Sequence, residues 1–263
     1  MDIERTVQIY RCEDTVDGIL SAIYEAGISG YGHDYIRIEP IRMDSPANLS
    51  LFAEYIDVET EQEKAEKVIR AVYEKISARA YTYLMYAAAA DAPDRGDALY
   101  QFLVHGFSMG DRVCDAFSIL SVKRVFELKR AVGNESHYSR EFMRFKEVSR
   151  EPRLMLATFE PTHRVLPMVM EHFRDRFPGE WFIIYDKHHL EAGFHTAEDE
   201  LEIRLLTTEE AERLEALSEK EEDYVALWKT FFHAIAIEER KNEKLQRNHM
   251  PLHYRTYVTE FIE

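Results

Sequence analysis

The chain has few cysteines, because Cys12 and Cys114 are the only two among its 263 residues. They lie far apart and outside any C-x-x-C pair, so we expect two buried free thiols in a reducing cytoplasm. A radical-SAM iron–sulfur cluster needs three closely spaced thiolates. Two distant cysteines cannot supply them, which excludes that cofactor for this chain.

Motifs that would identify an enzyme class are also missing. The sequence contains no G-x-x-x-x-G-K-[ST] loop, no G-x-G-x-x-G, no G-x-S-x-G, and no H-x-E with P-C-x-x-C. No apolar run approaches the roughly 20 residues of a membrane helix. The charged start, Met1 to Arg5, does not resemble a signal peptide. We therefore expect a cytoplasmic protein without a cofactor or a membrane partner.

The charge is strongly acidic overall but unevenly distributed. The net charge is −16, which argues against coating nucleic acid by bulk attraction. Residues 198–223 hold twelve acids and three bases, whereas residues 122–150 hold eight bases and four acids. Residues 240–255 add five bases and one acid. A basic face therefore requires that 122–150 and 240–255 meet in space; otherwise each is an ordinary solvated surface.

The hydrophobic periodicity predicts an α+β fold with mixed or antiparallel sheet elements, a helical middle section and C-terminal helices. Strand patterns occupy residues 6–13, 35–43, 51–58, 143–148, 152–159, 181–186, 190–195 and 200–206. Helical patterns occupy residues 17–27, 61–77, 78–90, 98–110, 112–133, 165–177 and 207–223, and another starts at Trp228. We expect one compact domain over 1–263, with a soft boundary near 91–97.

The segment from Trp228 to Glu260 is the most informative part of the chain. It begins as an amphipathic helix and becomes polar before Pro251. Lys and Arg contact phosphates, and Asn and Gln read base edges or satisfy backbone groups of a loop. The candidate nucleic-acid contacts in this segment are Arg240, Lys241, Asn242, Lys244, Gln246 and Arg247.

Other candidates lie earlier in the chain. Arg144 and Lys146 alternate with apolar residues as in a strand, so they should share one face. They suit a nucleic-acid backbone or an ordinary half-exposed strand. His188 and His189, with His195, could be imagined as zinc ligands. Adjacent residues of a strand point to opposite faces, however, so we expect no metal site.

At these residues the chain resembles a bacterial family built on a domain of unknown function, whose members are described as DNA metabolism or DNA repair proteins. The matching pieces, in order, are TVDGILSAIYEA, ESHYSREFMRF, EPTHRVLPMVMEHFRDRFPGEWFIIYD and ERKNEKLQRNHMPLHYRTYVTEF. The family's conspicuous positions fall here on His137, Arg144, His172, Arg176 and Asp186, among others. The chain departs from the family after Asp186. The family often has an arginine soon after this aspartate, whereas this chain has Lys187-His188-His189.

The resemblance implies a partner and a location for the chemistry. Family members accompany a radical-SAM protein of DNA modification, and some precede a uracil-DNA glycosylase-like domain. The resemblance thus implies that this chain binds DNA, binds the radical-SAM partner, or does both, while the partner carries the chemistry. By the same analogy, His172, Arg176 and Asp186 line a cleft.

Two other functions stay open at this point. The chain could be an adaptor that never touches DNA, which suits its charge of −16 best. It could instead be a hydrolytic enzyme acting on a nucleotide or a DNA lesion. Its acid–base groups would then be His172, Asp186 and His137, provided that they converge on one substrate.

Overall fold

The computed structural model describes residues 6–41, 52–151, 153–218, 250 and 252–258. The contacts of the chain divide it into two compact units, Met1–Gly133 and Asn134–Glu263. The helix α5 (Leu120–Phe142) contains the point of division. Residues 91–97, where the sequence suggested a soft boundary, lie inside the first unit, before and at the start of α4.

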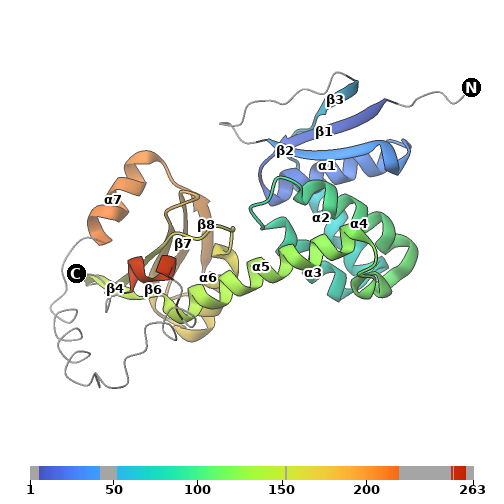
Figure 1. Ribbon diagram of the computed structural model, residues 1–263. Coiled ribbons are helices and arrows are strands. Elements are labelled where there is room, and N and C mark those ends of the chain that lie inside the picture. Colours follow the sequence, from blue (N-terminus) through green and yellow to red (C-terminus); the bar gives the residue numbers. More distant parts are fainter. Residues whose placement is uncertain (1–5, 42–51, 152, 219–249, 251, 259–263) are drawn as a thin grey trace, which may run out of the picture. The chain divides into compact units, whose positions relative to one another are not determined.

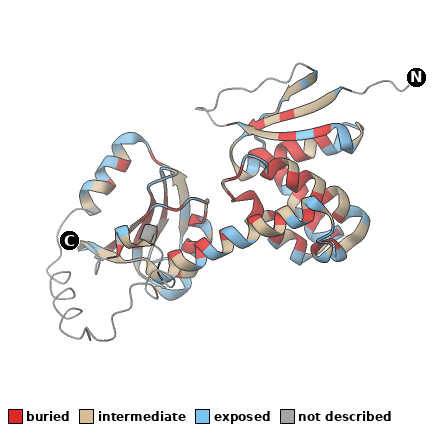
Figure 2. Cartoon of the chain, viewed as in Figure 1, coloured by how far each residue is buried: buried red, intermediate tan, exposed pale blue. Residues whose placement is uncertain are grey.

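The first unit contains a parallel three-stranded sheet in the order β2-β1-β3, combined with helices (Figure 1). Its strands are β1 (Val7–Glu13), β2 (Ile36–Ile41) and β3 (Ala53–Asp57). Its helices are α1 (Val16–Ile28), α2 (Gln62–Lys75), α3 (Ala78–Ala88), α4 (Arg95–Met109) and the short 3-10 helices η1 (His33–Tyr35) and η2 (Gly110–Asp115). Buried residues are concentrated on α1, α3 and α4 (Figure 2), so the helical middle section supplies most of this core.

The helix ends of the first unit were only partly predictable. The sequence offers Asp14 or Thr15 as the N-cap of the first helix. The side chain of Thr15 accepts a hydrogen bond from the Gly18 backbone N at 3.0 Å, so Thr15 is the N-cap of α1. The sequence also suggests a C-cap at Gly27 and a capping box of Thr60 with Glu63, and both predictions are wrong. Helix α1 runs through Gly27 to Ile28, and α2 begins after Glu61. Thr60 instead donates to the Glu13 carboxylate at 2.7 Å.

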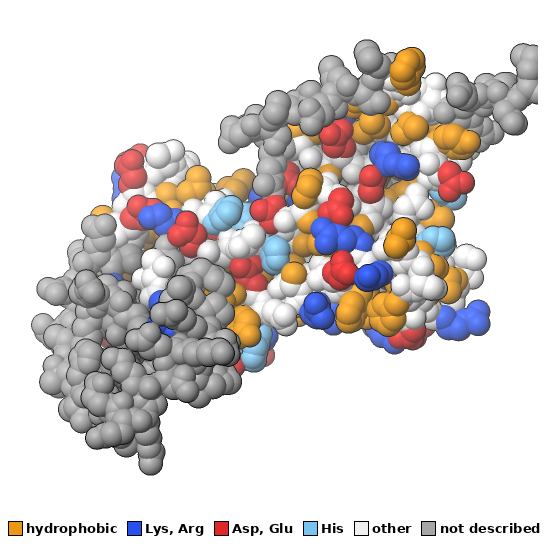
Figure 3. Space-filling view, in the orientation of Figure 1, with side chains coloured by type: hydrophobic (Ala, Val, Ile, Leu, Met, Phe, Trp, Pro, Cys, Tyr) orange, Lys and Arg blue, Asp and Glu red, His pale blue; other side chains and the backbone are white. Residues whose placement is uncertain are grey.

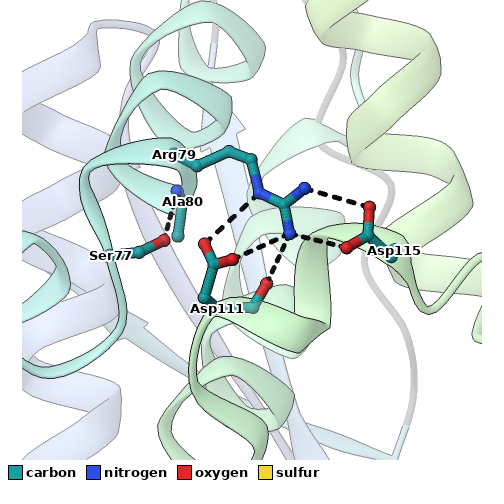
Figure 4. A network of polar contacts seen from close by, with 5 residues as sticks. All are labelled: Ser77, Arg79, Ala80, Asp111 and Asp115. Carbon is teal, nitrogen blue, oxygen red and sulfur yellow. Dashed lines mark hydrogen bonds and ion pairs between the residues drawn. The ribbon is translucent and has the colours of Figure 1, made fainter.

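An exposed ionic network connects α3 to η2 (Figure 4). Arg79 lies on α3, and its guanidinium donates to the carboxylates of Asp111 and Asp115 at 2.7–3.3 Å. At the start of the same helix, the Ser77 hydroxyl accepts from the Ala80 backbone N at 3.0 Å. Because the Arg79 side chain is 42% exposed, this network orients η2 more than it stabilises the fold.

The second unit contains a mixed five-stranded sheet in the order β4-β5-β6-β7-β8. Its strands are β4 (Phe145–Arg150), β5 (Arg153–Phe159), β6 (Trp181–Asp186), β7 (Glu191–His195) and β8 (Leu201–Leu205). Its further helices are α6 (Leu166–Arg176), α7 (Thr208–Ser218) and η4 (Leu252–Tyr257). Strands β5 and β6 are parallel and the other pairs are antiparallel, so the expected α+β class with a mixed sheet is confirmed.

The two faces of this sheet are covered by different helices. Phe182 contacts Phe145 and Phe177, near Phe173 of α6, with ring centroids 5.8 and 6.5 Å away. Its neighbour Ile183 belongs to the cluster that contains Ala211 and Leu214 of α7. Because successive strand residues point to opposite faces, α6 and α7 cover opposite faces of the sheet.

The run of residues 112–133 differs from the single helix that its pattern suggests. Residues 110–115 form η2, and α5 begins only at Leu120. Gly133 and Asn134, expected to punctuate the pattern, lie inside α5, which continues to Phe142. One glycine inside a helix costs only about 1 kcal/mol. The burial of the apolar side chains of Val125, Leu128 and Val132 on the same helix outweighs that cost.

Within the described part of the chain, no helix has both the length and the apolar character that crossing a membrane would need. Cys12 and Cys114 are buried free thiols, as expected. Burial raises the pKa of the Cys12 thiol to about 12.

Substitution of alanine for glycine should change the stability in opposite directions at Gly96 and Gly27. A Cβ on Gly96 would lie 2.6 Å from the backbone oxygen of Ile38, because α4 approaches β2 closely there. We expect Gly96→Ala to lower the free energy of unfolding by about 1–3 kcal/mol. Gly27 has no atom within 4 Å of its added Cβ, so Gly27→Ala should stabilise the chain by about 0.5–1 kcal/mol. Urea unfolding of both variants checks this, and equal effects would contradict it.

Candidate functional site

The segments that follow β5 and β6 start next to each other at one edge of the five-stranded sheet. Phe159 ends β5 and Asp186 ends β6, and the parallel register pairs these two residues. The Lys187 backbone N donates to the Phe159 carbonyl at 3.0 Å. Polar residues follow both strands at this edge. Ligands of open α/β sheets bind outside the carboxyl ends of parallel strands, so this edge is the first place to search for a site.

The side chain of Asp186 is fully buried, and both of its carboxylate oxygens are bonded to His189. One carboxylate oxygen accepts from the His189 backbone N at 3.1 Å, and the other lies 2.7 Å from Nδ1 of the same residue. The His189 side chain is 9% exposed. A carboxylate on Nδ1 fixes the tautomer and the orientation of the ring. The Nε2 atom of His189 is therefore the nitrogen left for a ligand.

Glu135 of α5 holds the loop that follows β5. Its carboxylate accepts hydrogen bonds from the backbone N of Thr162 at 2.8 Å and of His163 at 2.6 Å. Glu135 is 7% exposed. Burial lowers the pKa of His163, and nearby His189 lowers it further, whereas Glu135 acts in the opposite direction. The net result is a pKa of His163 below its ordinary value.

Arg164 and Glu191 form an ion pair at the same edge. Burial raises the pKa of Glu191, and the Arg164 guanidinium partly offsets this effect. We call the full group the carboxyl-edge cluster; its members are Glu135, His163, Arg164, Asp186, His189 and Glu191. It combines three carboxylates, one guanidinium and two imidazoles.

A second group, on α5 and α6, is positively charged. Burial lowers the pKa of His172 on α6, and the guanidinium groups of Arg140 and Arg176 lower it further. Arg140 donates to the Ser136 carbonyl, and Arg176 lies over the Phe177 ring at 6.0 Å. Among the residues that the structure describes, no carboxylate forms an ion pair with either arginine. We call Arg140, His172 and Arg176 the cationic cluster.

Some other bases of residues 122–150 have carboxylate partners nearby. Arg124 is bonded to Asp94 at 2.7 and 2.8 Å, and Arg150 lies 3.5 Å from Glu147. On the face shown in Figure 3, Lys and Arg side chains of the first unit lie among Asp and Glu side chains. The excess positive charge of this segment is therefore locally balanced at these positions, in contrast to the cationic cluster.

The three candidate catalytic residues have different partners. His137 is exposed on α5, and its Nε2 lies 3.1 Å from Glu141. His172 belongs to the cationic cluster, and Asp186 belongs to the carboxyl-edge cluster. Of the candidate nucleic-acid contacts, Arg176 is in the cationic cluster. Arg240, Lys241, Asn242, Lys244, Gln246 and Arg247 lie outside the described residues.

Arg144 and Lys146 flank an aromatic residue that fixes the direction of β4. The Phe145 ring contacts Phe173 of α6 with centroids 4.8 Å apart, so its side chain lies on the α6 face. Lys146, the next residue, is paired with Leu156 of the α7 cluster and lies on the opposite face. Arg144 precedes β4, and its guanidinium donates to the Met143 carbonyl at 3.3 Å.

The expectation that His188 and His189 point to opposite faces of a strand is wrong. Both residues belong to the turn between β6 and β7, and their rings stack with centroids 4.7 Å apart. His195 is buried at the end of β7 and bonded to the Glu180 carbonyl at 2.8 Å. In the part of the chain that the structure describes, no three His, Cys, Asp or Glu residues are arranged to hold a metal ion.

A small cavity lies near the same edge, between α5, the end of β5 and η4. Its volume is about 30 Å³, and its lining includes Ser139, Phe142 and Tyr254. The Ser139 hydroxyl is buried and has no hydrogen-bond partner within the described structure. A volume of this size holds about one water molecule and is too small for a nucleobase.

Comparison with known families assigns the chain to one of them. A family model described as a domain of unknown function, DUF4130, matches residues 93–260. Because the match covers more than half of the chain, the chain belongs to this family. No curated protein matches the chain. The matched span contains both clusters, whereas the N-terminal piece TVDGILSAIYEA lies outside it.

Sequence reasoning missed Glu135, Arg140 and His163, and it considered His189 only as a metal ligand. A signal for His163 and His189 was present, because a strand–helix–strand pattern over 152–186 predicts parallel strands with adjacent carboxyl ends. Glu135 and Arg140 had no comparable signal, since their roles depend on where α5 packs.

The hydrogen bonds from Thr162 and His163 to the Glu135 carboxylate lead to a prediction about stability. We expect Glu135→Ala to lower the free energy of unfolding by about 1–3 kcal/mol, because two backbone N–H groups lose a charged acceptor. Urea unfolding measures the loss, and faster amide exchange at Thr162 and His163 locates it.

The control for this substitution is Glu141→Ala on the same helix. Glu141 is exposed and bonded to exposed His137, so the change should stay within about 0.5 kcal/mol. If both variants lost the same stability, or if the exchange rates of Thr162 and His163 did not change, the assigned role of Glu135 would be wrong.

Proposed function

We propose that this chain is a DNA-associated accessory protein of a repair or base-modification system. In this proposal the second unit contacts DNA phosphates, and a radical-SAM partner carries the modification chemistry. The radical-SAM partner is inferred from the family resemblance described above. The chain cannot hold that cluster itself, because it has only two cysteines, which are distant in sequence.

The cationic cluster is the observation that supports DNA contact. Arg140 of α5 and Arg176 of α6 both lower the pKa of His172 and Asp175 opposes them, but no described carboxylate forms an ion pair with either arginine. Keeping like charges together costs free energy unless an anion compensates them. Phosphate oxygens accept hydrogen bonds from guanidinium groups in a two-pronged geometry, which makes arginine well suited to this contact.

The acidity of the chain limits how it binds. A net charge of −16 repels duplex DNA, so the contact must be confined to a small surface. The basic segment 240–255 is part of the proposal, with Arg240 and Arg247 as further phosphate contacts. An adaptor without DNA contact is the competing function, supported by the local ion pairs of Arg124 and Arg150.

Binding should depend steeply on salt if phosphates are contacted. We expect Arg140→Ala and Arg176→Ala each to weaken binding of a duplex oligonucleotide and to reduce the slope of log K against log[salt] by about 0.7–0.9. The reason is that each arginine displaces counterions from one phosphate. Fluorescence anisotropy across a salt series measures both effects, for the chain alone and with its radical-SAM partner.

Arg213→Ala is the matched control for these variants. Arg213 is 72% exposed on the acidic helix α7 and is paired with Glu209, so its removal should leave the slope unchanged. Binding that is absent at low salt would exclude direct contact. Retention of the radical-SAM partner without DNA would then select the adaptor.

The same contact should depend on pH through His172. Its pKa is lowered in the free protein by burial and by two arginines, so the ring is mostly neutral at pH 7. A bound phosphate favours the protonated ring, so affinity should rise as the pH falls below about 6.5, by roughly tenfold for each pKa unit that the phosphate restores. Anisotropy titrations between pH 5.5 and 8 at constant ionic strength measure this. His172→Gln should remove the difference, and an unchanged pH dependence in that variant would refute it.

A further inference from the structure

We propose that the buried ring of His195 is a pH-sensitive switch for the turn between β7 and β8. The ring fixes the turn when both of its nitrogens carry a proton and releases the turn when it is neutral. His195 is the last residue of β7, and its side chain is 0% exposed. The switch goes beyond the proposed function and does not depend on it, because no residue of either cluster takes part in these contacts.

Both ring nitrogens of His195 face hydrogen-bond acceptors. Nδ1 lies 2.8 Å from the backbone oxygen of Glu180, and Nε2 lies 3.3 Å from a carboxylate oxygen of Asp199. The ring also stacks on Phe182 with centroids 4.6 Å apart, which restricts its orientation. A neutral imidazole has a single N–H group, so only the protonated ring makes both contacts as hydrogen bonds.

Asp199 does not supply the missing proton. The Arg174 guanidinium on α6 donates to its two carboxylate oxygens at 2.7 and 2.6 Å. These bonds hold the pKa of Asp199 well below its ordinary value, and His195 lowers that pKa further. Asp199 is therefore a carboxylate, which only accepts hydrogen bonds. A neutral ring keeps its one proton on Nδ1, at the shorter contact, and presents the lone pair of Nε2 to a negatively charged oxygen.

The turn itself is held in an unfavourable backbone conformation. Asp199 has a φ angle of +66°, in the left-handed region that residues other than glycine rarely adopt. The turn is closed by hydrogen bonds from the Thr196 N to the Glu200 carbonyl at 3.0 Å and from the Asp199 N to the Thr196 carbonyl at 3.1 Å. Its residues 197–200 are exposed. Loss of the bond between Asp199 and the ring therefore favours opening of the turn.

The charged groups around the ring come from three elements. Glu180, in the loop before β6, presents its backbone oxygen to the ring, whereas its carboxylate is ion-paired with an arginine. Arg174 of α6 is bonded to Asp199. The turn adds Glu198 and Glu200, which are exposed on either side of Asp199. Among side chains, imidazole is the group that changes charge near neutral pH, so a pH change in that range acts on this contact through the ring.

Nuclear magnetic resonance of the full chain, labelled with ¹⁵N, tests the switch between about pH 5 and pH 9. At the acidic end we expect both ring nitrogens of His195 to give the signals of protonated nitrogens. When Nε2 loses its proton, the protection of the Thr196 and Asp199 amides against hydrogen exchange should fall by about 10- to 100-fold. This is the factor expected for the loss of a hydrogen bond between charged groups.

Two results of this measurement would overturn the proposal. One is a ring that loses its proton without a change in the protection of the Thr196 and Asp199 amides. The other is a ring that stays in one protonation state over the whole range. Protection is expressed relative to an unstructured peptide at the same pH, which removes the direct effect of pH on exchange. The unaltered protein is used, so the result does not depend on whether a variant folds.

Variants then assign the effect to the contact. His195→Phe keeps a ring on Phe182 but removes both bonds, so the protection of the Thr196 amide should be low at every pH. Asp199→Ala should give the same low protection while the ring still titrates. Glu198→Gln is the matched control, because it removes a charge from the same turn without touching the ring, and the pH dependence should persist. A His195→Phe chain that kept the pH dependence, or a Glu198→Gln chain that lost it, would contradict the assignment.

Discussion

The organisation of the second unit depends on one buried carboxylate. Glu135 belongs to α5, which precedes every strand of this unit, yet it binds the backbone between β5 and α6. Two hydrogen bonds to a charged acceptor hold that loop against the helix more firmly than neutral bonds would. The direction in which α6 leaves the sheet is therefore set by α5. The position of His172 and Arg176 beside Arg140 follows from the same contact.

The helices and strands of this chain can be predicted from the local hydrophobic pattern, but the residues at which they end cannot. The alternation in β5 and β6 and the period of α6 are visible in the sequence because one face of each element is buried. By contrast, the sequence suggested Thr60 as the cap of α2, but the residue at that position is Glu61. The reason is that the Thr60 hydroxyl is bonded to Glu13 at the end of β1. Gly133 does not end α5 because the burial of apolar residues on the same helix, such as Leu128 and Val132, compensates the local cost. Contacts between residues that are distant in sequence decide where these helices end, and a short window of sequence does not contain those contacts.

The candidate site shows the same division. Asp186, His172 and Arg176 were identified from the sequence, and the structure places each in a charged cluster. Their partners were not identified, because pairing His189 with Asp186 requires the turn between β6 and β7, whereas the sequence analysis treated His188 and His189 as neighbours on a strand. The family match over 93–260 contains both clusters and does not select between them. Only the contacts show that carboxylates dominate one cluster and arginines the other.

The helix α5 has a further consequence for the architecture of this family. The two units divide at Gly133, which is a hydrogen-bonded residue in the middle of that helix rather than part of a loop. Modules that recombine in evolution are normally joined by flexible linkers, where insertion or exchange disturbs little. Here a crossover at the division would cut a continuous helix two residues before its buried glutamate. The two halves are consequently expected to be inherited together.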